Sequence, residues 1–318
     1  MKSTVIAPSS SVRLAIREIA DADIEHVINL LSRGFFPIPR RYWEVGLERL
    51  RTRTIPHNMP RYGYLLEADG TSVGVILLIS SVRQIGSRQE LFSNLSSWYV
   101  EPEFRSHAAQ LFKRALTHKQ TTYLNLSPAL HTRPIIEAFG FRRYSEGQFL
   151  SLLALARNRR NTRASIITLD SLADADLEEK ERQLLETQAR YGCIAFCCKT
   201  TDGQTRPFVF VPRPRKIKGF VPCAQLAYCR QITDLVDVAG SVGRYLLLRG
   251  RPVVLIDANG PIPSLPGKFF RDVAPRYFKG AVAPALGDLT ETEATIVSMI
   301  LWPDWRRLQR QKENQCER

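Results

Sequence analysis

The sequence predicts a mixed α/β (α+β) protein of two tandem domains, each built on a mixed sheet. The chain has 318 residues, which exceeds the usual size of one hydrophobic core. Stretches in which apolar residues alternate are interleaved with stretches of helical spacing, as in folds that combine sheet and helix. Several short motifs of the first half return in the second half in the same order.

The first half predicts elements in the order βααβββαβαβ. Gly34 and Gly140 are expected to end the first and last helices, and the turn ADGT joins two strands as a hairpin. The predicted strands are 13–19, the two arms of 61–82, 91–100, 121–128 and 141–155, and the predicted helices are 22–35, 40–52, 102–119 and 132–140.

Three pairs of motifs indicate a duplication. ADADIE at 20–25 is answered by ADADLE at 173–178, and each begins a predicted amphipathic helix. YGYLLEADG at 62–70 is answered by YGCIAFCCKTTDG at 191–203, and RRYSEG at 142–147 by PRYFKG at 275–280. The predicted organisation is a flexible N-terminus (1–11), a first domain (12–155), a basic linker (156–163), a second, more degenerate domain (164–290) and a C-terminal helix or tail (291–318).

The net charge of +14 favours an anionic partner, such as a nucleotide cofactor, nucleic acid or an acidic surface. Cations gather at 157–163, 212–218 and 305–312. No aromatic ladder is interleaved with them, so stacking of single-stranded nucleic acid is not indicated. We interpret the clusters as solvated loops and a linker, and a nucleic-acid footprint stays the alternative.

The cysteines predict neither a metal site nor disulfides. Cys193, Cys197 and Cys198 lie in the apolar run GCIAFCC and lack a matched second pair or a nearby histidine. Buried reduced thiols are therefore expected. No apolar run approaches the roughly 20 residues that span a bilayer, and MKSTVIAPSSS lacks the apolar core of a secretory signal. The predicted location is the cytoplasm.

Three local motifs resemble those of a known family. Val-x-Pro-x-x-Arg runs from Val100 to Arg105 into a helix, the strand YLNLSP lies at 123–128, and a short helix ends in Gly140-Phe141 before another strand. Together with the element order, they resemble the GNAT superfamily of acyl-CoA-dependent acyltransferases. The resemblance covers roughly residues 12–155 and extends more faintly over 166–285.

The resemblance implies that acetyl-CoA or another acyl-CoA binds as cosubstrate. In the family, backbone N–H groups of the turn after the fourth strand hold the pyrophosphate at a helix N-terminus, and pantetheine lies between the splayed fourth and fifth strands. Arg105 matches the family's basic residue, but Ser106, Ala108 and Gln110 replace its glycines. The matching residues are Trp98, Tyr99, Val100, Arg105, Ser106, His107, Ala108, Ala109 and Gln110.

The resemblance also implies transfer of the acyl group to an amine, or alternatively a hydroxyl, with a base taking the proton. The family's general-acid tyrosine corresponds to Ile136, so no catalytic acid is assigned. Ser127, His131 and Glu101 are the candidate polar groups at strand ends. Each has a simpler interpretation: a turn former, a helix-start residue and a surface glutamate, respectively.

Two further groups of residues have alternative interpretations. Phe35, Phe36, Tyr42 and Trp43 either line an acyl or acceptor pocket or pack as helix core. In the second half, the residues Asp234 and Asp237 place negative charge where a phosphate would bind, which disfavours a second cofactor site. Gly240 and Gly243 are expected to be helix-packing glycines.

The sequence therefore predicts an acyl-CoA-dependent acyltransferase with a non-catalytic second domain. The first alternative is a non-catalytic acyl-CoA-binding or scaffold protein, and the second is a basic nucleic-acid-binding protein. The acceptor, the acyl chain length and a homodimer through the second domain are left open.

Overall fold

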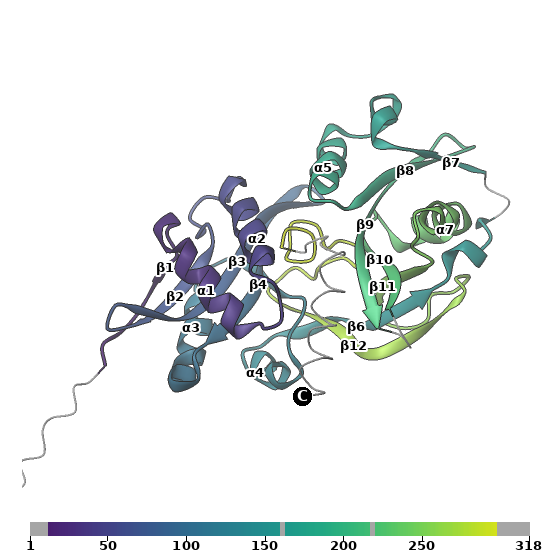
Figure 1. Ribbon diagram of the computed structural model, residues 1–318. Helices are drawn as coiled ribbons and strands as arrows, with labels where there is room; N and C mark the ends of the chain where they lie inside the picture. Colours follow the sequence, from purple (N-terminus) through teal and green to yellow (C-terminus); the bar gives the residue numbers. More distant parts are fainter. Residues whose placement is uncertain (1–11, 160–162, 217–219, 298–318) are drawn as a thin grey trace, which may run out of the picture.

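The computed structural model describes residues 12–159, 163–216 and 220–297 (Figure 1). The predicted N-terminal segment 1–11, part of the linker 156–163 and the predicted tail beyond residue 297 lie outside the described residues. The same holds for the basic cluster 305–312 and for Cys316.

Strands and helices alternate along the described chain, which confirms the mixed α/β class. The N-terminal half contributes strands β1 (Leu14–Glu18), β2 (Gly63–Ala68), β3 (Thr71–Ile85), β4 (Arg88–Val100), β5 (Thr121–Asn125) and β6 (Arg142–Ser151). Its helices are α1 (Ile24–Gly34), α2 (Arg40–Thr52), α3 (Ala108–Ala115) and α4 (Arg133–Ala138), with short 3₁₀ turns η1 (Asp21–Asp23), η2 (Pro102–His107), η3 (Leu130–Thr132) and η4 (Leu153–Leu155).

The C-terminal half also alternates strands and helices, but it has one helix between its first two strands where the N-terminal half has two. Its strands are β7 (Ala164–Ile167), β8 (Ile194–Thr200), β9 (Thr205–Lys216), β10 (Phe220–Tyr228), β11 (Val253–Ala258) and β12 (Gly267–Lys279). Its helices are α5 (Glu179–Arg190), α6 (Ile232–Asp237) and α7 (Ala239–Leu248), with the 3₁₀ turn η6 (Leu169–Asp174). β8 follows α5 after three residues, so no helix of this half occupies the place that α2 has between α1 and β2.

Helices cover both faces of the sheet, so the central strands are buried on both sides. Alternate residues of β2 and β3 contribute to opposite cores. Tyr64 and Ile76 pack with Leu111 of α3, whereas Leu65 packs with Leu31 of α1. This explains why β3 reads as a continuous apolar run without alternation.

Each half sends its last strand across the junction between the halves. The described residues form one sheet in the order β1-β2-β3-β4-β5-β12-β6-β11-β10-β9-β8-β7. Strand β12 pairs with β5 of the other half, β6 pairs with β11, and β6 and β12 pair with each other. Figure 1 shows β6 and β12 side by side between the two halves. The exchange joins both halves into a single sheet.

Two local expectations are corrected by this arrangement. The predicted helix 102–119 is shorter: it begins as the 3₁₀ turn η2 and ends as α3 at Ala115. RRYSEG begins β6, whereas PRYFKG ends β12, and the two segments pair antiparallel, with Arg142 opposite Phe278 and Ser145 opposite Arg276. They are therefore partners across the junction and do not occupy equivalent places in the two halves.

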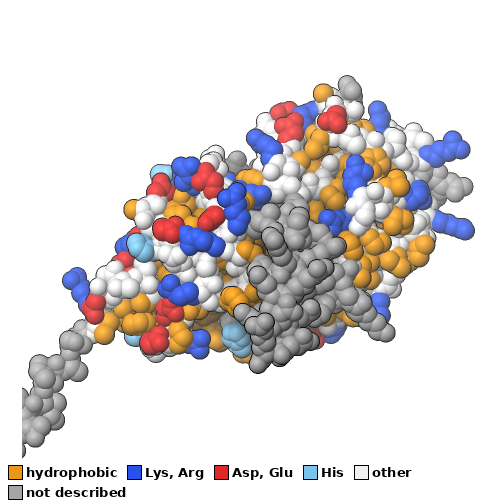
Figure 2. Space-filling model, viewed as in Figure 1, with side chains coloured by type: hydrophobic (Ala, Val, Ile, Leu, Met, Phe, Trp, Pro, Cys, Tyr) orange, Lys and Arg blue, Asp and Glu red, His pale blue; other side chains and the backbone are white. Residues whose placement is uncertain are grey.

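Positive and negative side chains alternate on the surface of the N-terminal half. Figure 2 shows Lys and Arg side chains interleaved with Asp and Glu over the N-terminal half on the face drawn. Arg40 pairs with Glu25 and Glu44, and Arg33 pairs with Glu101 at 2.7 Å. None of the helices in the described ranges is long and apolar enough to cross a membrane.

Candidate functional site

The candidate site begins where two parallel strands separate. β4 and β5 pair only from Leu91 to Asn94, opposite Thr121 to Leu124. β4 then continues to Val100, while β5 ends at Asn125. The edge of β4 from Leu95 onward therefore lacks β5 as a partner, and the two strands enclose a split.

A bulge in β4 lies at the same point. Leu77 pairs with Ser96 and Val75 with Tyr99, so β4 holds one residue more than β3 over this interval. Ser97 has φ +54°, a backbone conformation that favours glycine. A bulge of this kind bends a strand and redirects its side chains. Here the extra residue lies between Ser96 and Tyr99, both of which line the split.

The split contains a cavity of about 750 Å³. Residues from five places share its lining: the α1–α2 connection with the start of α2, Ile76 of β3, the second part of β4 with η2 and α3, the segment from Asn125 to Ile135, and the C-terminal half. The last group consists of Arg213, Arg276, Glu293 and Ala294. Both halves of the chain therefore build one cavity.

Aromatic side chains form one wall. The Phe35 ring lies 5.4 Å from Trp43 and 6.3 Å from Tyr99, between ring centres. Tyr99 donates to Glu101 Oε2 at 2.6 Å. Burial, with this hydrogen bond, raises the pKa of Tyr99 to about 12. Phe35, Tyr42 and Trp43 thus line the pocket and also pack against α1, whereas Phe36 is 75% exposed.

The predicted cofactor-binding residues divide into lining and surface positions. Trp98, Tyr99, Val100, Arg105 and Ala108 line the cavity. Ser106, Ala109 and Gln110 are exposed, and His107 is half-buried at the N-cap of α3. The N–H groups of Phe104 and Ala108 donate to Glu101 O and Arg105 O, because η2 runs directly into α3. Fewer amides are therefore open to a ligand than in an extended glycine loop.

Arg105 keeps the positive charge at this end of the cavity. Its side chain is exposed, and it has no hydrogen-bond or ion-pair partner among residues 12–159, 163–216 and 220–297. Two cavity-lining tryptophans, Trp43 and Trp98, bury indole N–H groups that lack an acceptor in the described part of the chain. The exposed, unpartnered guanidinium is a feature that fits a ligand with phosphate oxygens, whereas the two indole N–H groups are enclosed by the protein.

The three candidate polar residues have different surroundings. Ser127 donates to Glu293 Oε1 at 2.5 Å, and His131 lies exposed on η3 at the cavity lining. Glu101 accepts from Arg33 and Tyr99 and does not line the cavity. The position of the family's tyrosine, Ile136, is fully buried in the core beneath α4.

Sequence reasoning missed Glu293 and Arg213. The Glu293 carboxylate accepts from Ser96 on β4 and from Ser127 after β5, so it bridges the split. Arg213 of β9 donates to Ala294 O at 3.3 Å, and burial lowers the pKa of its guanidinium. Both residues come from the C-terminal half, more than 80 positions from the strands that they approach, and no local pattern marks them.

In the C-terminal half, the corresponding split is filled by the chain itself. β10 and β11 pair in parallel only at Cys223–Gln225, opposite Val253–Leu255. Beyond that point Leu289 N donates to Ala227 O at 2.7 Å, and Cys229 N donates to Gly287 O at 3.0 Å. Since β9 occupies the other edge of β10 as far as Tyr228, the segment 287–289 takes the edge that β11 has left.

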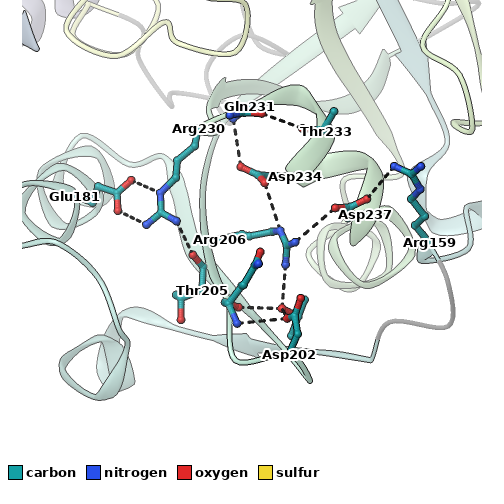
Figure 3. A network of polar contacts seen from close by, with 12 residues as sticks. Arg159, Glu181, Asp202, Thr205, Arg206, Arg230, Gln231, Thr233, Asp234 and Asp237 are labelled. Carbon is teal, nitrogen blue, oxygen red and sulfur yellow. Dashed lines mark hydrogen bonds and ion pairs between the residues drawn. The ribbon is translucent and has the colours of Figure 1, made fainter. Parts of the chain in front are cut away.

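The helix start after β10 also carries internal partners. Asp234 and Asp237 pair with Arg206 of β9 at 3.4 and 3.5 Å, and Arg159 lies 3.8 Å from Asp237 (Figure 3). Arg206 is 8% exposed. The two carboxylates therefore already neutralise a buried cation at the place where a phosphate would need positive charge.

The remaining glycine and metal expectations concern α7 and the cysteines. A side chain at Gly243 would lie 2.1 Å from Leu153 C, and one at Gly240 would lie 2.5 Å from Ala156 O. Both glycines thus allow α7 to pack closely, as predicted. Cys197, Cys198, Cys223 and Cys229 are buried, and Cys193 is partly buried. Among the residues in the described ranges, no group of three or more His, Cys, Asp or Glu could hold a metal ion.

Comparisons with solved structures identify the fold. Neither a family model nor a curated protein matches the sequence. A GCN5-related N-acetyltransferase from Kribbella flavida is similar, with TM-score 0.52, 13% identity, 84% of this chain and 71% of that chain covered. A GCN5-related N-acetyltransferase from Anabaena variabilis has a TM-score of 0.51 and 12% identity, with 84% of this chain and 72% of that chain covered. Eis1 from Mycobacterium abscessus has a TM-score of 0.51 and 14% identity, with 84% of this chain and 73% of that chain covered. The chain therefore has the fold of the GCN5-related N-acetyltransferases, the GNAT superfamily that its motifs resemble.

Proposed function

We propose that this protein is an acyl-CoA-dependent acyltransferase that uses one site, the split between β4 and β5. The separation of these strands after Asn94 and Leu124, with a cavity of about 750 Å³ between them, is the observation that carries the proposal. The unpaired edge of β4 offers backbone groups to the amides of pantetheine, in the manner of strand addition. The cavity is of the size of known ligand pockets.

The cofactor's phosphates are assigned to the end of the cavity near Arg105. Arg105 and Ala108 line that end, at the start of the eight-residue helix α3. A helix N-terminus and a free guanidinium both favour an anion. Residues 96–100 of β4 separate this end from Glu293 and span about 13 Å. The thioester would therefore approach the end of the cavity that the C-terminal half completes.

Calorimetric titration of acetyl-CoA and a longer acyl-CoA tests this assignment. Arg105→Glu should abolish or weaken binding by 10-fold or more, because it replaces an attraction to phosphate by a repulsion. Arg88→Glu is the matched control, since Arg88 is exposed at the opposite end of β4. Equal affinity in both variants, or no binding to the parent protein, would contradict the proposed function.

The second candidate function is acyl-CoA binding without turnover. The conversion of the family's turn into η2 and the buried Ile136 at the tyrosine position favour it. The two functions differ in one measurement, the release of CoA from bound acetyl-CoA in the presence of amines. Binding without any release of CoA would support the second candidate. For the first candidate function we propose an amine as the acyl acceptor, because structures with a similar fold are N-acetyltransferases.

A further inference from the structure

The segment that follows β12 is attached to the N-terminal half by three arginines. Arg83 donates to Thr290 O at 2.6 Å and pairs with Asp288 at 3.0 Å. Arg53 pairs with Glu291, and Arg49 donates to Ile296 O at 2.9 Å. Ile296 and Val297 then join the core beneath α1 and α2. The backbone between these contacts is therefore held in place, and Glu293 lies within it.

Asn94 fixes Glu293 at the point where the strands separate. The Glu293 N–H donates to Asn94 Oδ1 at 2.7 Å, and Asn94 Nδ2 donates to Leu95 O at 3.0 Å and to Leu124 O at 3.4 Å. Asn94 is 1% exposed. One buried amide thus ties together β4, β5 and the C-terminal segment, and it directs the Glu293 side chain into the split.

The Glu293 carboxylate retains capacity for a further donor. Its oxygens accept from Ser96 and from Ser127, and a carboxylate has about four acceptor positions. Within the described ranges no Lys, Arg or His lies within 4 Å of it. Glu293 lines the cavity and is only half-buried. It is therefore a fixed acceptor without a direct ion pair among the described residues. Arg213 and Arg276, which line the same cavity, attract it over a longer distance, and it faces the space that the acceptor would enter.

We propose that Glu293 is the catalytic base of the reaction and that the C-terminal half supplies it; this rests on the proposed function. The neutral amine nitrogen attacks the thioester carbonyl carbon, so that a C–N bond forms and the C–S bond breaks. The amine proton passes to the Glu293 carboxylate, and CoA leaves as a thiolate that takes a proton from water. Glu293 then gives its proton to the hydroxide so formed, which restores the carboxylate. An ammonium substrate binds first by donating to Glu293 and loses one proton to solvent before attack.

A purely structural latch is the competing role for Glu293. A latch requires only that Ser96 and Ser127 find an acceptor, and a glutamine carbonyl provides one at the same place. Base catalysis requires a group that takes up a proton, which the amide cannot do. Glu293→Gln therefore separates the two roles, and Glu186→Gln is the control for the same chemical change. Glu186 is exposed on α5, outside the cavity, and has no ion pair within the described ranges.

The experiment measures three quantities on the full chain: the Kd of acetyl-CoA, the melting temperature, and the release of CoA with a panel of amino acids, polyamines, amino sugars and short peptides. Glu293→Gln should leave Kd within about twofold and lower kcat/KM by about 100-fold or more, with KM for acetyl-CoA little changed. Glu293→Asp should recover part of the rate. Glu186→Gln should retain the parental rate.

Each other result contradicts a stated part of the proposal. Failure of the parent protein to bind acetyl-CoA overturns the proposed function. Binding by the parent protein without release of CoA for any amine overturns the assignment of Glu293 as a base but leaves the cofactor site in place. A rate in Glu293→Gln within fivefold of the parent assigns the residue to the latch role.

Discussion

Arg276 of β12 lies against Asp257 of β11 inside the sheet, with Arg276 Nε 2.8 Å from Asp257 Oδ2. Their side chains are 7% and 3% exposed. Gln148 of β6 and Gln225 of β10 donate to the other carboxylate oxygen at 3.5 and 3.4 Å. Arg276 also donates to Leu126 O, just after β5. The buried pair therefore connects the two halves at the place where their last strands are exchanged.

Asp257→Asn should lower the free energy of unfolding by about 3–5 kcal/mol, because it leaves the Arg276 guanidinium buried without its counter-charge. Urea denaturation measures the change. The double variant Asp257→Leu with Arg276→Met should recover much of this loss, since both charges are then removed together. A loss below about 1 kcal/mol in the single variant would contradict the assignment.

Asp23 should stabilise the fold above pH 4 and cease to do so in acid. Arg17 donates to both carboxylate oxygens at 2.6 and 2.8 Å and thereby lowers the pKa of Asp23 from 3.8. The native state then binds fewer protons than the unfolded state. The stabilisation by Asp23 is complete above the pKa that this carboxyl has in the unfolded state, and it disappears as the pH falls through its pKa in the folded state. The Arg17 side chain is 41% exposed, so the effect should be about 1 kcal/mol or less.

Asp23→Asn should therefore flatten the dependence of unfolding free energy on pH between about 5 and 2. Asp170→Asn is the control, since Asp170 is exposed on η6 and has no ion pair within the described ranges. The same acid slope in Asp23→Asn and in the parent protein would show that other carboxylates dominate this range.

Gly34→Ala should affect both stability and the cavity. A Cβ at Gly34 would lie 2.3 Å from Tyr99 Cδ2, so the ring that lines the cavity must move. Overpacking of this kind costs about 1–3 kcal/mol, and displacement of Tyr99 should weaken acetyl-CoA binding. Gly260→Ala is the control because nothing lies within 4 Å of its Cβ position. Calorimetry and thermal unfolding of both variants test this; equal values in the two would contradict it.

Each chain should bind one acyl-CoA. In the C-terminal half, segment 287–289 occupies the edge of β10 that a pantetheine would need, and Asp234 and Asp237 are paired with Arg206. Native mass spectrometry with acetyl-CoA should therefore show a single bound molecule that Arg105→Glu removes. Two molecules per chain, or one that persists in Arg105→Glu, would place a site in the C-terminal half.

Local sequence alone determined most of the elements. The apolar spacing of 24–34 and the turn residues of ADGT act within a few residues of the chain, so α1 and the β2–β3 hairpin could be predicted. Local sequence also predicted that a helix follows the motif that begins at Val100, and that the carboxylates after β10 disfavour a phosphate there. The same local spacing indicated the mixed α/β class, and the resemblance of the short motifs to a known family then indicated the likeness to acyltransferases.

Tertiary structure alone decided which strands become neighbours and which residues meet in the split. Strand exchange between β6 and β12 depends on pairing across more than 100 residues, which leaves no periodic signal in either segment. Glu293 reaches Ser96 across 197 positions, and Arg276 meets Asp257 only because β12 and β11 flank β6. Hydrogen bonding and charge pairing act through space, so the sequence could name these side chains but could not bring them together.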